Sequence, residues 1–419
     1  MPRFLIQLLL VFLPFHAFIV TLTSKYLFGG NQDTLPIANF IVASWKEGVL
    51  FLLLCFGIKH IRKFQWKPID SWIFFFIALH LAYALVQHFT HTTPLSQIIW
   101  GLRSNLEMLG AFWIIRLFNF TSKEIQSFIK ILLISTSISL LFGIFQLVVP
   151  CETLQVFGYS PYVSSWVADK PLPCGHGVGE GLDTIRMMGT FSSPNALASF
   201  LILSLGLLWY SWKQKLFPQW ILIPAFLLHA GSLILTFSRG AWLGSIIATG
   251  FLIFTSFQRR SKKTLIWIGS VVLVGMITLG LLLFLSPSRS GSTLEHFHKP
   301  IDGMERVIEK PWGYGVGMAG PISLRFPPDG SQAKISENWY IQIAEEIGVF
   351  GLTIALVFLV STFFFLWKEK QNHFAMALLF AFIAISINAV FLHTWTNDTA
   401  TSLVFWMMFG LYIKQSKYS

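Results

Sequence analysis

The sequence SFIKILLISTSISLLFGIFQLVV at residues 127–149 contains a single charged side chain, Lys130. A helix of about 20 apolar residues is long enough to cross the roughly 30 Å hydrocarbon core of a bilayer. Comparable runs recur at residues 4–22, 36–58, 70–88, 97–116, 191–210, 218–237, 240–257, 265–285, 339–366, 373–392 and 398–414. The pattern predicts an all-α polytopic integral membrane protein with about twelve transmembrane helices. We expect a single membrane domain over residues 1–419, because no soluble segment is long enough to fold alone.

The composition indicates the same class of protein, because 54% of the residues are hydrophobic and only 12% are charged. The net charge of +11 does not indicate a nucleic-acid partner, since Lys and Arg cluster in alternate connections between the apolar runs. These basic connections lie at residues 59–67, 116–123, 213–215, 259–263, 368–370 and 414–417. The positive-inside rule therefore places them, and both termini, in the cytoplasm. The first run lacks a convincing small-residue cleavage site and is interpreted as a retained span.

Two long polar segments, residues 150–190 and 286–338, interrupt the apolar pattern and are expected on the same outer side of the membrane. The first contains Cys151 and Cys174, for which a disulfide and two free thiols both remain open. The second contains an expected short amphipathic helix around residues 301–308 and a turn-rich tract at residues 311–317. Neither glycine-rich tract follows a strand that would open a nucleotide-binding βαβ unit, so we interpret the glycines as turns.

Arg239 lies in the short sequence TFSRG at residues 236–240, which joins two apolar runs at the outer surface. Its position near the start of the second run places it beside a helix N-terminus, where free N–H groups favour anions. Its guanidinium offers a planar set of donors that suits phosphate oxygens. The pattern therefore predicts a phosphate-binding arginine, and the alternative is an interfacial arginine that extends to lipid headgroups.

Arg186 precedes the sequence MMGTFSSPN at residues 187–195, in which Ser193 and Pro194 are expected as the N-cap and first residue of a helix. Arg186 would then lie just outside that helix start. Two permanent cations at outer helix starts could together hold a diphosphate, with Asn195 and Ser238 as candidate supporting residues. The alternative for Arg186 is an ordinary solvated loop charge.

Glu337 and Asn338 stand at the start of the run at residues 339–366. A carboxylate at the membrane surface can serve as a general base, although acidic residues at helix starts also simply stabilise the helix dipole. Glu345 and Glu346 lie deeper in the same run, where ionisable groups usually face a partner or a cavity. Asp398 is one more outer carboxylate.

Other charges fall inside the apolar runs and are interpreted as structural ion pairs. Lys46 and Glu47 are adjacent, while Arg103 and Glu107 have the spacing of a same-face helical pair. The GxxxG spacing of residues 240–244 predicts close helix packing. The outer histidines show no convincing zinc-site spacing, so we predict neither a metal nor another cofactor.

Four sequence tracts resemble the O-antigen ligase and O-antigen polymerase superfamily. The tracts MGTFSSPNALA at residues 188–198 and TFSRGA at residues 236–241 resemble its core signatures. The tract KPWGYGVG at residues 310–317 is similar to the family's Pro-x-x-Gly-x-Gly loop. The pair at residues 337–338, followed by GVFG at residues 348–351, is similar to its polar-pair and glycine motif. The four motifs occur in the family's order within residues 185–410.

The resemblance implies a metal-independent, GT-C-like inverting glycosyltransferase in the bacterial inner membrane, with a periplasmic active site and a role in O-antigen or lipopolysaccharide biosynthesis. The donor would be a glycan on undecaprenyl diphosphate, and the acceptor another lipid-linked glycan or lipid A–core. By position, Arg186 and Arg239 would hold the diphosphate and stabilise its charge as the glycosidic bond breaks. Glu337 would activate the acceptor hydroxyl.

Glu337 departs from the ligase branch of the family, which typically has histidine at this position. We therefore favour a polymerase of lipid-linked repeat units over a ligase that transfers glycan to lipid A–core. A different class of protein, a secondary transporter or a lipid-linked glycan flippase, would place its ionisable groups near the bilayer midplane and would usually show internal pseudosymmetry. No internal repeat is visible in the sequence, but the charges within the runs keep this alternative open.

Overall fold

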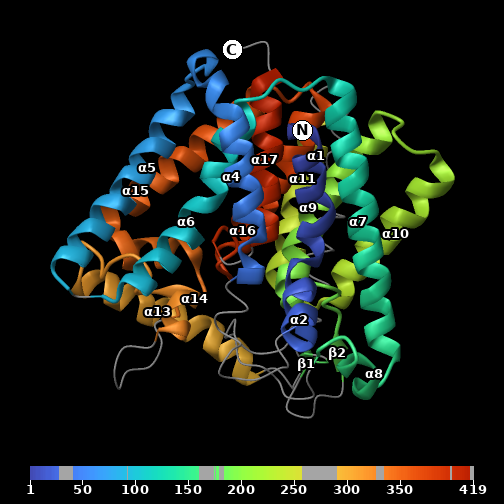
Figure 1. Ribbon diagram of the computed structural model, residues 1–419. Coiled ribbons are helices and arrows are strands. Elements are labelled where there is room, and N and C mark those ends of the chain that lie inside the picture. The colour runs from blue at the N-terminus through green and yellow to red at the C-terminus, as the bar shows by residue number, and fades with distance from the viewer. Residues whose placement is uncertain are drawn as a thin grey trace.

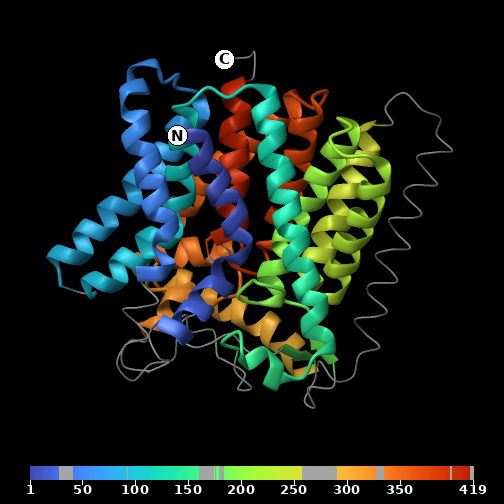
Figure 2. The same cartoon turned by 45° about the vertical axis from the view of Figure 1, so that its right-hand side comes forward.

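The computed structural model describes residues 1–27, 41–91, 93–159, 174, 176–178, 184–256, 290–326, 335–396 and 399–415, and these form a helical bundle (Figures 1 and 2). Eleven of the twelve predicted apolar runs coincide with helices, listed here in chain order. They are α1 (Pro2–Phe12) with η1 (Leu13–Phe15) and α2 (His16–Leu27), α4 (Trp45–Gly57) with η2 (Ile58–Lys63), α5 (Pro68–Phe89), α6 (Leu95–Arg116), α7 (Ser122–Val148), α9 (Pro194–Lys213), α10 (Gln219–Leu235), α11 (Arg239–Ser256), α15 (Trp339–Lys368), α16 (His373–Asn388) and α17 (Thr399–Gln415). The run at residues 265–285 lies outside the described residues.

The connections between these helices contain the remaining short elements. They are α8 (Cys151–Gln155), the strands β1 (His176–Val178) and β2 (Thr184–Arg186), α13 (Ser290–Glu309) and α14 (Gly320–Arg325). The two strands form an antiparallel ribbon in which His176 pairs with Arg186. The helix expected around residues 301–308 is confirmed as part of α13, which is longer than the sequence pattern indicated.

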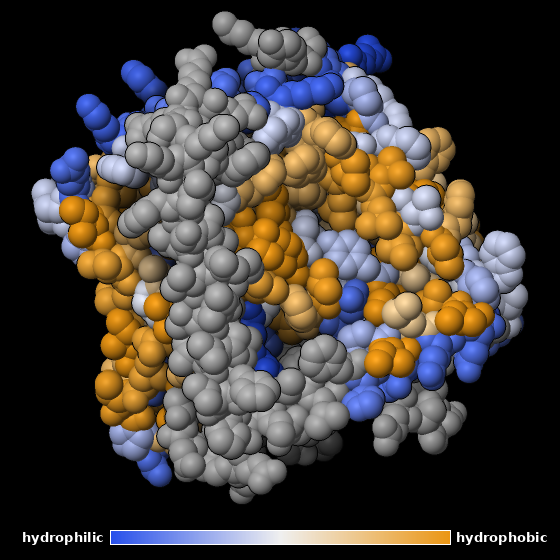
Figure 3. Space-filling view, turned by 180° about the vertical axis from the view of Figure 1, so that it is seen from behind, coloured by the Kyte–Doolittle hydropathy of each residue, from blue (hydrophilic) through white to orange (hydrophobic). Residues whose placement is uncertain are grey.

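Five helical segments in the described part of the chain are long and apolar enough to cross a membrane: Pro2–Leu27, Pro68–Phe89, Ser122–Val148, Pro194–Lys213 and Trp339–Lys368. Large apolar side chains are also exposed on the outside of the bundle, for example Phe75 on α5, Ile138 on α7 and Leu227 on α10. Figure 3 shows hydrophobic side chains spread over the middle of one face, with hydrophilic ones along its upper edge. Such a surface is typical of contact with lipid, so the prediction of an all-α membrane protein is confirmed, whereas twelve spans remain a prediction.

The centre of the bundle is formed by α9, α16 and α17 (Figure 1). Residues 403–413 of α17 are buried on all sides, as expected for a helix that is enclosed by other helices. The GxxxG spacing at the start of α11 allows close packing on α16, because a side chain at Gly244 would overlap the backbone carbonyl of Ala384.

The two ends of the bundle differ in what they carry. Both chain termini lie at one end, and α8, the β1–β2 ribbon, α13 and α14 lie at the opposite end (Figures 1 and 2). We call the second of these the loop end. Cys151 and Cys174 form a disulfide there, with their Cα atoms 5.3 Å apart. Of the two alternatives open from the sequence, the structure therefore contains the disulfide.

Candidate active site

Arg186 is placed by the start of α9, as the sequence pattern predicted. Ser193 is the N-cap of this helix, and its hydroxyl accepts a hydrogen bond from the N–H of Ala196. Arg186 ends β2, and its guanidinium donates from Nε to the Thr236 carbonyl at 2.7 Å and from Nη2 to Asn195 Oδ1 at 2.8 Å. These bonds hold the half-buried guanidinium between the start of α9 and the end of α10.

Arg239 is the first residue of α11 and is half-buried at the loop end. The turn before it is tight, since Phe237 adopts a left-handed φ of 50°, which is uncommon for a residue other than glycine. The buried Ser238 begins the helix by accepting the Trp242 N–H with its carbonyl at 3.0 Å. The turn thus brings Arg239 to a helix start, where the backbone dipole favours an anion.

Asn388, at the end of α16, connects these helix starts. Its Nδ2 donates to Ser199 Oγ at 3.0 Å and to Thr394 Oγ1 at 3.2 Å, and Ser199 Oγ in turn donates to the carbonyl of Asn195. A side chain at Gly240, in the first turn of α11, would lie 2.6 Å from Asn388 Oδ1. The starts of α9 and α11 therefore both meet at the end of α16.

Glu337 and Asn338 meet the same end of α16 from the other side. Asn338 is the N-cap of α15, accepting N–H groups of its first turn with Oδ1, and the Trp339 N–H donates to the Ala389 carbonyl at 2.9 Å. Glu337 has a φ of 50°, and its Oε1 accepts a hydrogen bond from Lys299 Nζ of α13 at 2.6 Å. Asn338 thus has a structural role in capping, while the carboxylate of Glu337 faces α13.

His393 is a buried neighbour of this pair. Burial is the main cause that lowers its pKa to about 4; the charge of Glu337 raises the pKa and that of Lys299 lowers it. Its Nε2 has no hydrogen-bond partner among the residues that the structure describes. An imidazole in this setting is neutral at physiological pH, so one ring nitrogen can donate a hydrogen bond and the other can accept one.

The α15 helix is interrupted ten residues after Glu337. Ile347 and Gly348 leave the helical conformation, and Gly348 has a φ of 75° and a ψ of 177°, a combination essentially restricted to glycine. The tract at residues 311–317 lies against this break. A side chain at Gly313 would come within 2.6 Å of the Gly348 nitrogen, so both glycines are needed for the close approach.

Backbone hydrogen bonds satisfy the groups that the break releases. They join Tyr314 N–H to the Glu345 carbonyl at 2.6 Å, Gly315 N–H to the Glu346 carbonyl at 2.8 Å, and Val349 N–H to the Pro311 carbonyl at 2.9 Å. The sequence pattern predicted turns in this glycine tract, and the structure confirms them. The pattern did not indicate that the tract and the later glycine motif are two halves of one contact.

The two acidic residues inside α15 each have a partner. Glu345 Oε1 accepts from Arg306 Nε of α13 at 2.6 Å. Glu346 is fully buried; its Oε2 accepts from Asn105 Nδ2 at 2.6 Å and its Oε1 from Gln342 Nε2 at 3.4 Å. The expectation that deep carboxylates face partners is therefore confirmed.

The charges within α4 and α6 form one cluster, not two separate pairs. Lys46 Nζ lies 2.6 Å from Glu107 Oε1 and 2.7 Å from Glu47 Oε1, and Arg103 Nε pairs with Glu47. The same-helix pairing of Arg103 with Glu107 was therefore wrong. The opposite charges on the neighbouring helix are closer, because buried groups pair across the helix contact that encloses them.

Lys299, Arg306 and Asn388 are the members of the site that the sequence analysis missed. The sequence does contain a signal for Lys299 and Arg306, which are seven residues apart, or about two helical turns. Glu337 and Glu345 are eight residues apart, so the two basic residues roughly match the spacing of the two acidic ones. Nothing in the sequence marks Asn388 as different from other polar residues in a span. Asp398 lies outside the described residues.

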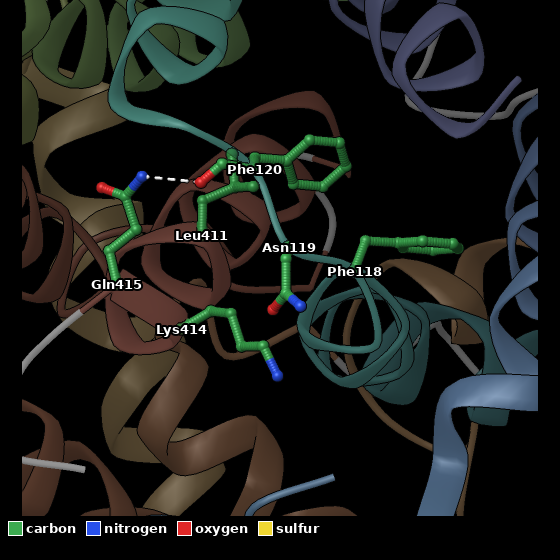
Figure 4. Close-up of a pocket in the computed structure, with 6 residues that line it drawn as sticks. All are labelled: Phe118, Asn119, Phe120, Leu411, Lys414 and Gln415. Carbon is green, nitrogen blue, oxygen red and sulfur yellow. Dashed lines mark hydrogen bonds between the residues drawn. The ribbon is translucent and has the colours of Figure 1, made fainter. Parts of the chain in front are cut away.

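A small pocket lies at the end that carries the termini, far from these residues. It has a volume of about 40 Å³ and is lined by Phe118, Asn119, Phe120, Leu411, Lys414 and Gln415 (Figure 4). Gln415 Nε2 closes one side by donating to the Phe120 carbonyl at 2.9 Å. A cavity of this size holds about one water molecule, so it is too small for a glycan.

Comparison with known proteins leaves the family of the chain open. No model of a protein family matches the sequence, and no curated protein is significantly similar to it.

Proposed function

We propose that the chain is a membrane-embedded glycosyltransferase of the O-antigen ligase and polymerase type, acting at the periplasmic face of the bacterial inner membrane. One observation carries the proposal: Arg186, Arg239 and Glu337 lie beside the starts of α9, α11 and α15, and all three helix starts meet the end of α16. Two permanent cations and a carboxylate are the groups that transfer of a glycan from a lipid diphosphate needs.

In the proposed reaction, the acceptor hydroxyl attacks the anomeric carbon of the donor glycan. The bond from that carbon to the diphosphate oxygen breaks, and undecaprenyl diphosphate leaves with the electron pair. Arg186 and Arg239, together with the N–H groups at the starts of α9 and α11, stabilise the negative charge on the leaving diphosphate. Glu337 takes the proton of the hydroxyl, and Lys299 offsets the charge of its carboxylate in the resting enzyme.

We favour polymerisation of lipid-linked repeat units over ligation to lipid A–core. The preference rests on Glu337, where the ligase branch of the resembled family typically has histidine. His393 lies near Glu337, but burial lowers its pKa to about 4, so it is a weak base and does not take the place of that histidine.

The experiment that tests the proposal supplies purified protein with a lipid-diphosphate-linked repeat unit, with and without lipid A–core, and separates the products by size. A ladder of lipid-linked glycans without core supports the polymerase. Product that forms only with core identifies a ligase. Absence of any product from donors of several sugar compositions, with folded protein, contradicts the proposed chemistry.

One structural feature favours the different class of protein, a flippase or secondary transporter. Broken helices with buried acidic residues are typical of transporters, and α15 is interrupted next to Glu345 and Glu346. The released backbone groups, however, are bonded to residues 311–315, and Glu345 is paired with Arg306. Glycan synthesis by protein in detergent, where no compartment exists, distinguishes the two classes.

A further inference from the structure

The helix α13 carries three parallel stripes of residues: two have the i, i+3, i+7 spacing of one helix face, and the third has the i, i+3 spacing. The first stripe is apolar and exposed: Ile301, Met304 and Ile308 are 52%, 56% and 74% accessible. The second is acidic and exposed: Asp302, Glu305 and Glu309. The third contains Gly303 and Arg306, which face α15. The helix thus has one face that packs on the protein, one acidic face that is exposed and one apolar face that is exposed.

The inward stripe fixes how α13 is rotated on the bundle. A side chain at Gly303 would lie 2.7 Å from Ile341 of α15, and Arg306 pairs with Glu345. Because both contacts face α15 and successive residues of a helix are about 100° apart, the apolar stripe points away from α15, and the acidic stripe lies on the flank between the two. A helix that was merely covered by water on its outer side would not separate apolar from acidic side chains in this way.

The apolar edge continues onto a surface that already has the character of a lipid-facing helix. Trp312, just after α13, is 76% exposed, and its carbonyl accepts a hydrogen bond from Tyr83 of α5. Val86 and Phe89, in the last turn of α5, are also exposed. Tryptophan is enriched where membrane proteins meet the interface between hydrocarbon and headgroups. Trp312 therefore links the edge of α13 to the outside of α5.

We infer that α13 is an interfacial helix whose Ile301–Met304–Ile308 edge is immersed in the outer leaflet of the bilayer. The occupant of this surface is the phospholipid of the membrane itself, at the boundary between headgroups and acyl chains. The acidic stripe faces water. Lys299 pairs with Glu337 and Arg306 pairs with Glu345, so the depth of α13 in the lipid also sets the depth of these two carboxylates. This inference does not depend on the activity proposed above.

Spin labels on adjacent stripes test this inference. Single cysteines replace Met304, Ile308, Glu305 or Glu309 in the Cys55→Ser background, because Cys55 is a free cysteine. The protein is reconstituted in phospholipid nanodiscs without donor lipid, so a bound isoprenoid chain cannot contribute. Collision of each label with oxygen, which concentrates in lipid, is compared with collision with a water-soluble nickel chelate. Ile138→Cys on α7 provides the lipid reference.

We expect the labels at Met304 and Ile308 to collide several-fold more with oxygen relative to nickel than the labels at Glu305 and Glu309. Nickel accessibility at Met304 equal to that at Glu305 would place the edge in water and overturn the inference. A label at Met304 that is immobilised and shielded from both reagents would show that protein covers the edge, which also overturns it. All four labels lie on exposed positions, so none disturbs the packing of α13 on α15.

Discussion

Arg239 is the residue at which a diphosphate-binding role can be separated from anchoring to lipid headgroups. We expect Arg239→Ala to lower the rate of glycan transfer by about 10²- to 10³-fold, the usual effect of removing one donor that stabilises developing negative charge. Arg239→Lys should also be impaired, because it keeps the charge but loses the planar set of donors. An arginine that only extends to headgroups would tolerate lysine.

The transfer assay on purified protein measures both variants, with Arg62→Ala as a matched control. Arg62 is an exposed arginine in η2, in the basic connection between α4 and α5. Its removal alters the overall charge by the same amount but should leave the rate unchanged. Wild-type rates for both Arg239 variants would contradict the assignment of Arg239 to the donor diphosphate.

His393 makes stability depend on pH in a defined direction. Its pKa is about 4 in the folded protein and 6.5 in the unfolded chain. Above pH 6.5 it is neutral in both states and contributes no pH dependence. Between pH 6.5 and 4 only the unfolded chain gains the proton, so the folded state loses up to roughly 3 kcal/mol, in accordance with proton linkage.

The variant His393→Gln removes this contribution. We expect the difference in unfolding free energy between variant and wild type to change by this amount in favour of the variant as the pH falls from 7 to 4. Chemical unfolding in detergent at several pH values measures it. A difference that is constant with pH would show that His393 is as easily protonated in the folded protein as in the unfolded chain.

At the scale of elements, the break in α15 depends on a glycine. Gly348 has a positive φ, and a side chain there would lie 2.6 Å from the Pro311 carbonyl oxygen. We expect Gly348→Ala to lower the unfolding free energy by about 1–3 kcal/mol, the usual cost of a strained backbone conformation. It should also loosen residues 311–315, which hydrogen exchange of their N–H groups can measure.

A matched control is Gly231→Ala in α10, where an added methyl group meets nothing within 4 Å. Alanine in a helix interior is favoured over glycine by about 0.5–1 kcal/mol, so this variant should be slightly stabilised. Equal effects of the two substitutions would mean that the break in α15 does not need glycine.

The helices could be predicted from the sequence far better than their contacts. Apolar length alone located α7 and α9, and the Ser193–Pro194 pair gave the start of α9, since these signals are local. The partner of Lys46 could not be derived, because Glu107 is distant in sequence and competes with the adjacent Glu47. The interruption of α15 was also missed: its sequence contains no proline, and a glycine is tolerated in many helices.

The candidate site has the same limit: its residues could be predicted from the sequence, but their contacts could not. Arg186, Arg239 and Glu337 could be named because each stands at or shortly before the start of a predicted helix. That they meet depends on α16, a helix in which His373 and Ser386 are the only polar residues before Asn388. Its contacts with Ser199 and with the first turn of α11 arise from packing in three dimensions, which no spacing in the sequence encodes.

At the scale of the whole molecule, both termini lie at one end of the bundle and the disulfide at the other (Figure 1). A disulfide persists in an oxidising compartment, and basic connections favour the cytoplasm. Both signals therefore predict the same orientation, with the loop end outside. In this orientation Arg186, Arg239 and Glu337 would face the compartment in which we propose that the lipid-linked glycan is exposed.

Thiol labelling in intact cells tests this orientation, using a reagent that does not cross the inner membrane. In the Cys55→Ser background, Cys151 and Cys174 should react from outside only after an impermeant reductant opens the disulfide. The variant Lys215→Cys, in the basic connection between α9 and α10, should react only after the inner membrane is permeabilised, in a background that also lacks Cys151 and Cys174. Labelling at Lys215 in intact cells would reverse the orientation and move the proposed site away from any periplasmic substrate. Labelling of Cys151 without reductant would instead preserve the orientation and show that the disulfide is absent in the cell.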